Sequence, residues 1–99
     1  MKPVLIRPAA AADIEDIFIW YQNQRYGLGD EFREALRSTL NHIAENPRLY
    51  QVIHRGTRRA LLVRFPYGVY FREFPEAIVI VACMHGRRSP RRWQSRREV

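Results

Sequence analysis

The sequence has a single cysteine, Cys83, among its 99 residues. One cysteine excludes an intramolecular disulfide framework and a cysteine-rich zinc site, and we expect a cytoplasmic protein with no metal and no cofactor. The apolar neighbours of Cys83 favour a buried, unreactive thiol. Long hydrophobic runs are missing too. None approaches the ~20 residues that span a bilayer, and the few apolar residues after Met1-Lys2-Pro3 are too short for a secretory signal.

Common enzyme signatures are also absent. The chain contains no glycine-rich dinucleotide motif, no P-loop, no HExxH zinc motif and no GxSxG nucleophile motif. Its length fits one small domain and excludes a large multidomain enzyme. Motifs alone therefore indicate no standard catalytic class.

Lysine is nearly absent. Lys2 is the only one, whereas the chain has sixteen arginines and a formal net charge of +7. Residues 1–47 carry seven acids and five bases, but residues 48–99 carry twelve arginines and three glutamates. A positive field of this kind attracts phosphate or an acidic protein, and guanidinium groups bind both phosphate and carboxylate through paired hydrogen bonds.

The first half of the chain predicts a short strand and two helices. The strand is Val4–Ile6, with a proline at each end. The first helix has an apolar stripe at Ile14, Ile17, Phe18 and Tyr21, and Gly27 and Gly29 end it. Asp30 is expected as the N-cap of the second helix, whose apolar face is Phe32, Leu36, Leu40 and Ile43 and which Asn46-Pro47 ends. The short link between the helices predicts an antiparallel hairpin.

Beyond Pro47 the pattern becomes strand-like. We expect strands over residues 60–65, 69–72 and 78–84, with a tight turn at 66–68 and the last strand buried on both faces. Short turns between them favour an antiparallel meander. The predicted fold class is α+β, with a helical hairpin packed on a small antiparallel sheet in the order β-α-α-β-β-β. We expect one domain over residues 1–99, with a basic, mobile tail from about residue 94.

The segment after the last predicted strand is the candidate catalytic site. A histidine at a strand end, His85, could exchange protons near neutral pH, and Arg87 could stabilise an oxyanion or a phosphate. Trp93 lies among arginines, and it either stacks on a nucleic-acid base or folds back to seal the edge of the sheet. The alternative for the whole segment is that His85 ends the strand and the arginines are solvated.

Binding residues are expected elsewhere as well. Trp20 lies off the apolar stripe of the first helix, so it is either exposed for a protein partner or partly buried against the second helix. The residues that we expect to bind a partner or nucleic acid are Trp20, Arg58, Arg59, Arg64, Arg88, Arg91 and Arg92.

Several short motifs occur in a recognisable order. They are Ala12-Asp13-Ile14, Trp20-Tyr21, Gly27-Leu28-Gly29 with Phe32, Ile43-Ala44-Glu45-Asn46-Pro47 with Tyr50, Arg58-Arg59-Ala60-Leu61-Leu62, Phe65-Pro66-Tyr67-Gly68-Val69-Tyr70-Phe71, and Met84-His85-Gly86-Arg87-Arg88-Ser89-Pro90 with Trp93. Together they cover about residues 4–93. In this order and spacing the chain resembles the RelE/ParE family of toxins from type II toxin–antitoxin modules, whose fold is a helical hairpin against an antiparallel sheet.

The resemblance implies a growth-inhibiting toxin that a cognate antitoxin neutralises through an acidic, flexible C-terminal segment. ParE-like members inhibit DNA gyrase by a protein–protein contact, whereas RelE-like members cleave mRNA on the ribosome. Arg87 matches the RelE-type arginine and Trp93 the aromatic near the C-terminus. However, Tyr67 stands where that branch has a sheet arginine, and residues 46–64 contain no lysine. The ParE-like branch is therefore favoured.

Two alternatives to gyrase inhibition stay open. In a metal-independent mRNA endonuclease, Arg87 would stabilise the phosphorane, His85 would act as acid or base, and Trp93 would stack on a base. In a small basic RNA- or DNA-binding module, affinity for nucleic acid would fall steeply with salt and growth would not stop.

Overall fold

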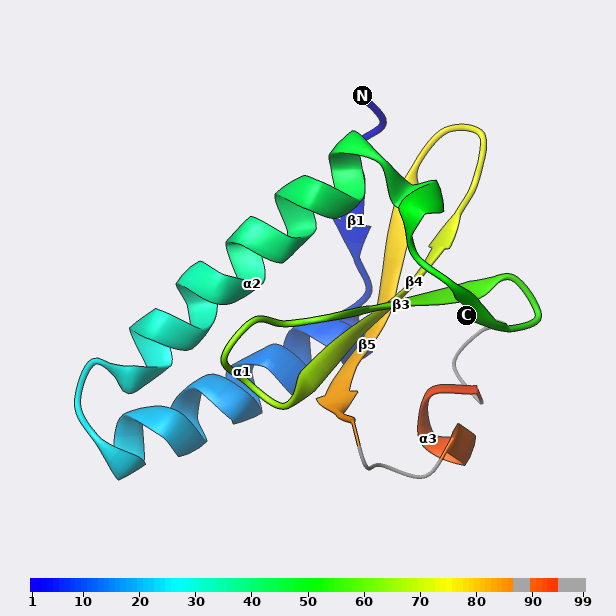
Figure 1. The fold of residues 1–99 in the computed structure, drawn as a ribbon. Coiled ribbons are helices and arrows are strands. Elements are labelled where there is room, and N and C mark those ends of the chain that lie inside the picture. Colours follow the sequence, from blue (N-terminus) through cyan, green and yellow to red (C-terminus); the bar gives the residue numbers. More distant parts are fainter. Residues whose placement is uncertain (87–89, 95–99) are drawn as a thin grey trace.

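The computed structural model, which describes residues 1–86 and 90–94, is built on a mixed five-stranded sheet (Figure 1). In chain order the elements are β1 (Val4–Ile6), α1 (Pro8–Gln24), α2 (Leu28–Glu45), the 3₁₀ turn η1 (Pro47–Leu49), β2 (Val52–His54), β3 (Thr57–Leu61), β4 (Tyr67–Glu73), β5 (Ile78–His85) and α3 (Pro90–Gln94). The strands lie in the order β1-β5-β4-β3-β2. The parallel pair is β1 with β5, and the other pairs are antiparallel.

The predicted α+β class, a helical hairpin on a sheet, is confirmed, but the sheet is larger than expected. Two elements account for the difference: β1 joins it as a parallel edge strand, and β2 forms the opposite edge. β2 and β3 are joined through Arg55 and Gly56, which both have positive φ, as a two-residue hairpin turn requires. Because Arg55 is not a usual residue for that conformation, the turn carries little sequence signal.

β3 begins and ends earlier than predicted. It spans Thr57–Leu61 instead of residues 60–65, and Tyr67 belongs to β4 instead of the turn. The chain leaves the strand at Leu62, whose amide donates to the Tyr67 carbonyl at 3.0 Å. Arg64 then adopts a left-handed φ of 76°, which no strand residue can have. The apolar residues Leu62 and Phe65 are buried from a loop rather than from a strand.

The helical hairpin is closed by a side chain that sequence analysis did not single out. Gln22 Oε1 accepts hydrogen bonds from the amides of Gly27 at 2.9 Å and Gly29 at 2.8 Å. These amides lie at the start of α2, which begins at Leu28, so they have no partner within the helix. The prediction that Asp30 is the N-cap of α2 is wrong. Asp30 lies in the first turn of the helix, and Gly27 is the N-cap. A Cβ on Gly29 would lie 2.7 Å from the Phe18 carbonyl oxygen, so the crossing of the helices requires glycine there.

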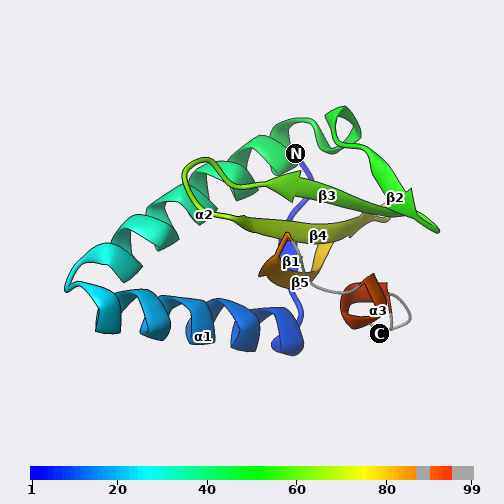
Figure 2. The ribbon, with the colours of Figure 1, turned by 60° about the horizontal axis from the view of Figure 1, so that its bottom comes forward.

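The sheet has two covered faces, which we call the hairpin face and the far face. The hairpin face packs against α1 and α2, and its core includes Phe71, Ile80 and Cys83 of the sheet with Ile17 and Phe32 of the helices. The far face carries a second cluster of buried residues, Tyr70, Val79, Val81, Ala82, Met84 and Trp93. Figures 1 and 2 show the hairpin along one face and the short α3 beside the other. β5 is therefore buried on both faces, as the sequence predicted.

One polar contact joins α1 to the sheet. β1 ends at Ile6, so the edge of β5 beyond Ile80 has no strand beside it. The Cys83 amide on that edge donates to Asp13 Oδ2 of α1 at 3.0 Å. Cys83 is 2% exposed, and without the carboxylate its amide would be buried without this acceptor. The predicted burial of Cys83 is confirmed, and burial with the Asp13 charge raises the pKa of its thiol to about 12.

None of the helices in the described part of the chain is long and apolar enough to span a bilayer. The basic tail predicted from about residue 94 continues into residues 95–99, which lie outside the described residues.

Replacing Asp13 by alanine should lower the free energy of unfolding by roughly 1–3 kcal/mol, because it removes the acceptor of a buried amide. The measurement is urea unfolding followed by circular dichroism. Asp16→Ala is the matched control, since Asp16 is exposed on the same helix and its loss should change stability by less than about 0.5 kcal/mol. Equal midpoints for both variants would contradict the role of Asp13.

Cys83 should not react with a thiol reagent at pH 8 while the protein is folded. The thiolate is the reactive form, and a pKa of about 12 leaves almost none at that pH. In guanidinium chloride, where the ordinary value of 9.0 returns, modification should be rapid and complete. Rapid modification of the native protein would show that the thiol is accessible.

Candidate functional site

His85 lies at the end of β5 and faces the hairpin side of the sheet. It pairs across the strands with Tyr67, and the two rings meet edge to face with centroids 5.5 Å apart. Tyr67 also approaches the rings of Tyr21 in α1 and Phe32 in α2, at 6.1 and 6.0 Å. His85 is therefore half-buried against an aromatic neighbour that belongs to the helix-facing core.

Trp93 lies on the other face. Its ring stacks on Tyr70 with centroids 4.9 Å apart and planes 16° apart, and His54 contacts its edge at 5.9 Å. Only 5% of Trp93 is exposed. Of the two interpretations of this residue, the structure shows the one in which the ring folds back and seals the sheet. A nucleic-acid base could reach the ring only after α3 left the far face.

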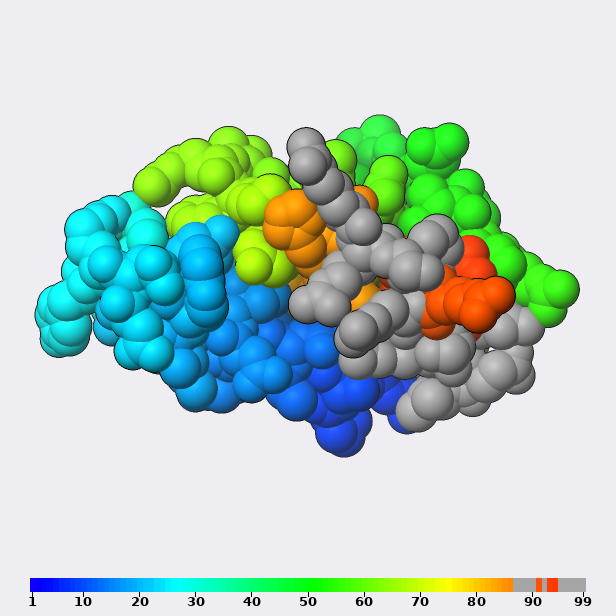
Figure 3. All heavy atoms as spheres, turned by 90° about the horizontal axis from the view of Figure 1, so that it is seen from below, coloured from blue at the N-terminus to red at the C-terminus, as the bar shows by residue number. Residues whose placement is uncertain are grey.

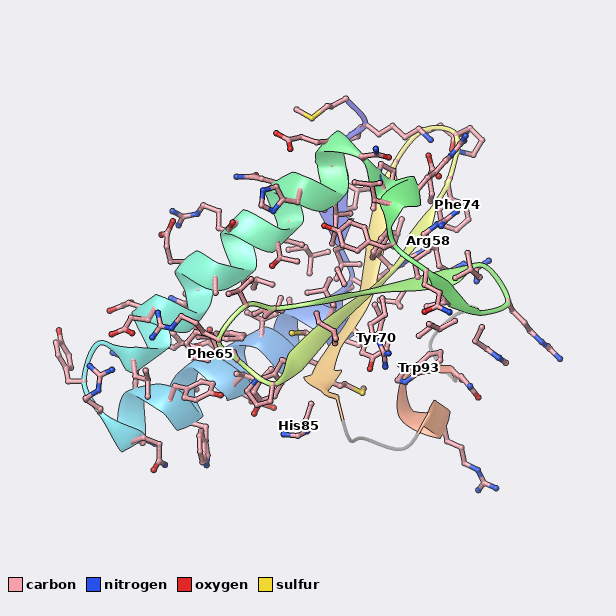
Figure 4. The ribbon with its side chains drawn as sticks, in the orientation of Figure 1. Arg58, Phe65, Tyr70, Phe74, His85 and Trp93 are labelled. Atoms are coloured by element: carbon pink, nitrogen blue, oxygen red, sulfur yellow. The ribbon has the colours of Figure 1, made fainter. Side chains whose placement is uncertain are left out.

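The three candidate catalytic residues are therefore not assembled around one point. His85 and Trp93 lie on opposite faces of the sheet and are well separated in Figure 4. The third, Arg87, lies outside the described residues, as does Arg88. In the described part of the chain, no three His, Cys, Asp or Glu side chains gather to hold a metal ion.

A row of rings connects the end of β5 to the surface of α1. It runs from His85 through Tyr67 and Tyr21 to Trp20, which meets Tyr21 edge to face at 5.1 Å. Burial and the neighbouring Tyr67 hydroxyl, which shares a hydrogen bond with Tyr21, raise the pKa of Tyr21 above its ordinary value of 10.0. The row ends at Trp20, which is 54% exposed. Trp20 is therefore exposed, and its role in binding a partner stays a prediction.

The two neighbouring arginines of β3 point to opposite faces. Arg58 lies across from Phe71, and its guanidinium donates to the Tyr50 carbonyl at 2.6 Å. Arg59 lies across from Tyr70 on the far face. The aliphatic stem of Arg59 passes over Gly68, where an added Cβ would lie 3.2 Å from Cγ and Cδ of Arg59. Arg58 thus anchors the chain before β2, whereas Arg59 is held over the sheet surface.

Arg64 has an internal partner that the sequence did not reveal. Its guanidinium lies 2.8 Å from Glu31 Oε1 in α2, and the expectation that Arg64 binds a partner stays a prediction. The same carboxylate also binds Arg25 at 3.2 Å. These two guanidinium groups hold the pKa of Glu31 below its ordinary value of 4.5. The pair fixes the loop between β3 and β4 to the hairpin.

The remaining predicted binding residues lie in α3. Arg91 is exposed, and the side chain of Arg92 is not among the described ones. Arg72 of β4 was not among the predicted binding residues, and its guanidinium donates to the Arg55 carbonyl at 2.6 Å. Arg72 lies across from Thr57 of β3, on the far face. This bond could be predicted only from that pairing, and the pairing requires the correct strand register.

The ion pairs are unevenly distributed over the described chain. Four glutamates hold six cations, in the pairs Lys2–Glu73, Arg48–Glu73, Arg25–Glu31, Arg64–Glu31, Arg33–Glu15 and Arg37–Glu34. These pairs lie along the helices, in the loops and at the end of β4. Among the described residues, the three sheet arginines Arg58, Arg59 and Arg72 have no carboxylate partner.

A groove of about 400 Å³ lies between α2 and the loop that joins β3 to β4. Its lining includes Ala35, Thr39 and His42 from the helix and Val63 from the loop, with Glu31 and Glu34 nearby. Val63 is 75% exposed. Arg64 lines the groove as well and pairs there with Glu31, so the groove combines apolar and charged side chains.

Comparisons with known proteins agree with this architecture. A family described as "ParE toxin of type II toxin-antitoxin system, parDE" matches residues 4–90. A solved structure entitled "Chromosomal ParDE TA system from P. aeruginosa" superposes with a TM-score of 0.76 at 18% sequence identity. The alignment covers 86% of this chain and 96% of that one. No curated protein matches the sequence.

Replacing Trp93 by alanine should lower the free energy of unfolding by about 3 kcal/mol, because it removes a buried ring from the far face. Urea unfolding measures the loss. Trp20→Ala is the control for removal of an indole, and it should cost less than about 1 kcal/mol because half of Trp20 is exposed. An unchanged midpoint for Trp93→Ala would mean that α3 does not stay on the sheet.

Proposed function

Because the chain belongs to the ParE toxin family of type II toxin–antitoxin systems, we propose that it inhibits DNA gyrase through a protein–protein contact. Family membership implies a cognate antitoxin. We further propose that the antitoxin neutralises the toxin with an acidic segment that binds the arginine-bearing far face of the sheet.

The separation of His85 and Trp93 is the observation that carries the choice of gyrase over mRNA. Cleavage of RNA by its own 2′-hydroxyl needs a base, an acid and a stabiliser of the phosphorane around a single phosphate. Here the residue predicted to transfer the proton, His85, is half-buried on the hairpin face, whereas the proposed stacking ring, Trp93, lies on the far face. Arginine does not replace the missing group, because it does not release a proton near neutral pH.

Charge supports the acidic antitoxin segment. The chain has a net charge of +7, and the described sheet arginines have no carboxylate beside them. On the far face, Leu61 lies two residues beyond Arg59 along β3, and 62% of Leu61 is exposed. A flexible segment with a carboxylate opposite Arg59 and an apolar side chain opposite Leu61 would match this surface. Such a segment gains both affinity and orientation from the charge pairing.

The purified chain should abolish supercoiling of relaxed plasmid by DNA gyrase, and its induction should stop growth without cutting mRNA. Supercoiling is measured on agarose gels, and primer extension on translated mRNA is measured in the same cells. Adding the cognate antitoxin should restore supercoiling. Cuts at translated codons with normal supercoiling would instead establish the nuclease. Salt-sensitive nucleic-acid binding without growth arrest would establish the simple binding module.

A further inference from the structure

The outer side of α1 carries two large apolar side chains that no described element covers. The helix contributes Ala10 and Ile17 to the core, yet Ile19 and Trp20 are 46% and 54% exposed. At 100° per residue, Ile19 lies about opposite the buried Ile17, and Trp20 lies on the flank turned away from α2. Figure 3 shows the outer side of α1, in blue, uncovered at the surface. Exposed aromatic and branched side chains next to each other mark an interaction site more often than isolated ones do.

Trp20 is also held in place before any partner arrives. Its ring rests edge-on against Tyr21, and Tyr21 is fixed by its contacts with Tyr67 and by T-shaped packing on Phe65 at 5.1 Å. A side chain held in this way loses little freedom when it becomes buried at an interface. Tryptophan supplies large contact areas at the energetic centres of interfaces. Trp20 therefore has the properties of an anchor.

The exposed charge of α1 disfavours the acidic partner proposed for the sheet. Residues 8–24 carry three acids and no lysine or arginine. One of the acids, Asp13, accepts the Cys83 amide and another, Glu15, pairs with Arg33 of α2, while Asp16 is exposed. An acidic antitoxin segment would be repelled here, whereas a surface with an apolar pocket and basic residues around it would be attracted.

We propose that the outer side of α1, centred on Ile19 and Trp20 and flanked by Asp16, is the surface that docks on DNA gyrase. The complementary site on gyrase is an apolar pocket with a basic rim. This inference rests on the proposed function and adds to it a division of labour: the antitoxin depends on the far face at Arg59, and the target depends on α1.

The experiment measures two quantities for each full-length variant, namely the concentration that halves gyrase supercoiling and the affinity for the cognate antitoxin. Trp20→Ala should raise the inhibitory concentration by on the order of 30-fold, the size of an interface hot spot. It should change antitoxin affinity by less than about threefold. Arg59→Glu should weaken the antitoxin at least about tenfold.

Two further variants keep the test independent of folding. Asp16→Arg reverses an exposed charge without removing packing, and it should weaken gyrase inhibition several-fold while the urea midpoint stays unchanged. Tyr26→Ala is the matched aromatic control, since Tyr26 is 89% exposed in the connection between the helices. It should leave both quantities unchanged.

The outcomes separate the inference from the function beneath it. If the unmodified chain does not inhibit gyrase, the proposed function is wrong. If it does inhibit, and folded Trp20→Ala and Asp16→Arg inhibit equally well, the assignment of α1 is wrong and the function stands. If Trp20→Ala weakens the antitoxin as much as gyrase, the outer side of α1 is not specific to the target, and the division of labour fails.

Discussion

The contact between Asp13 and the Cys83 amide fixes how the two halves of the molecule meet. β1 is too short to pair with all of β5. Beyond the end of β1, the Asp13 carboxylate of α1 accepts a hydrogen bond from the edge of β5 in place of a strand. A helix bound to a sheet edge by a charged hydrogen bond cannot rotate or slide without leaving a buried amide unpaired. The same contact therefore determines which side of α1 enters the core, and so where Tyr21 meets Tyr67 and where Trp20 reaches the surface.

The alternation of side chains along the strands then determines which face of the sheet each residue occupies. Cys83 and His85 face the hairpin and Met84 faces away, while Arg58 and Arg59 divide in the same manner on β3. The extra residue in β5, where Tyr70 and Phe71 pair with Ala82 and Ile80, turns both Val81 and Ala82 to the far face. That face then has an apolar floor on which Trp93 lies. Residues that are neighbours in sequence are thus distributed over two surfaces.

Sequence patterns predicted the parts of the fold that depend on period and composition. The apolar stripes predicted the hairpin, the unbroken apolar run predicted β5, and the helical period placed Trp20 away from the core. The sequence patterns failed where the conformation of one or two residues sets the end of a strand. The left-handed φ of Arg64 follows the early end of β3, and the Arg55–Gly56 turn allows β2 to pair with β3. In the candidate site, the pairing of Arg64 with Glu31 joins residues 33 apart in sequence. A contact of that range depends on the packed hairpin, so composition could not predict that this arginine is already bound.

Charge connects the fold to the function that we propose. The chain uses its glutamates to fasten helices, loops and strand ends, and in the described structure none reaches the arginines of β3. None of the described carboxylates neutralises Arg59, and the cognate antitoxin is the partner that the family provides. α1 lies on the other face of the sheet, and its exposed Asp16 gives that surface a negative charge. The attraction that orients an acidic segment on the sheet becomes repulsion at Asp16. Control and target recognition can then depend on different residues of one small domain.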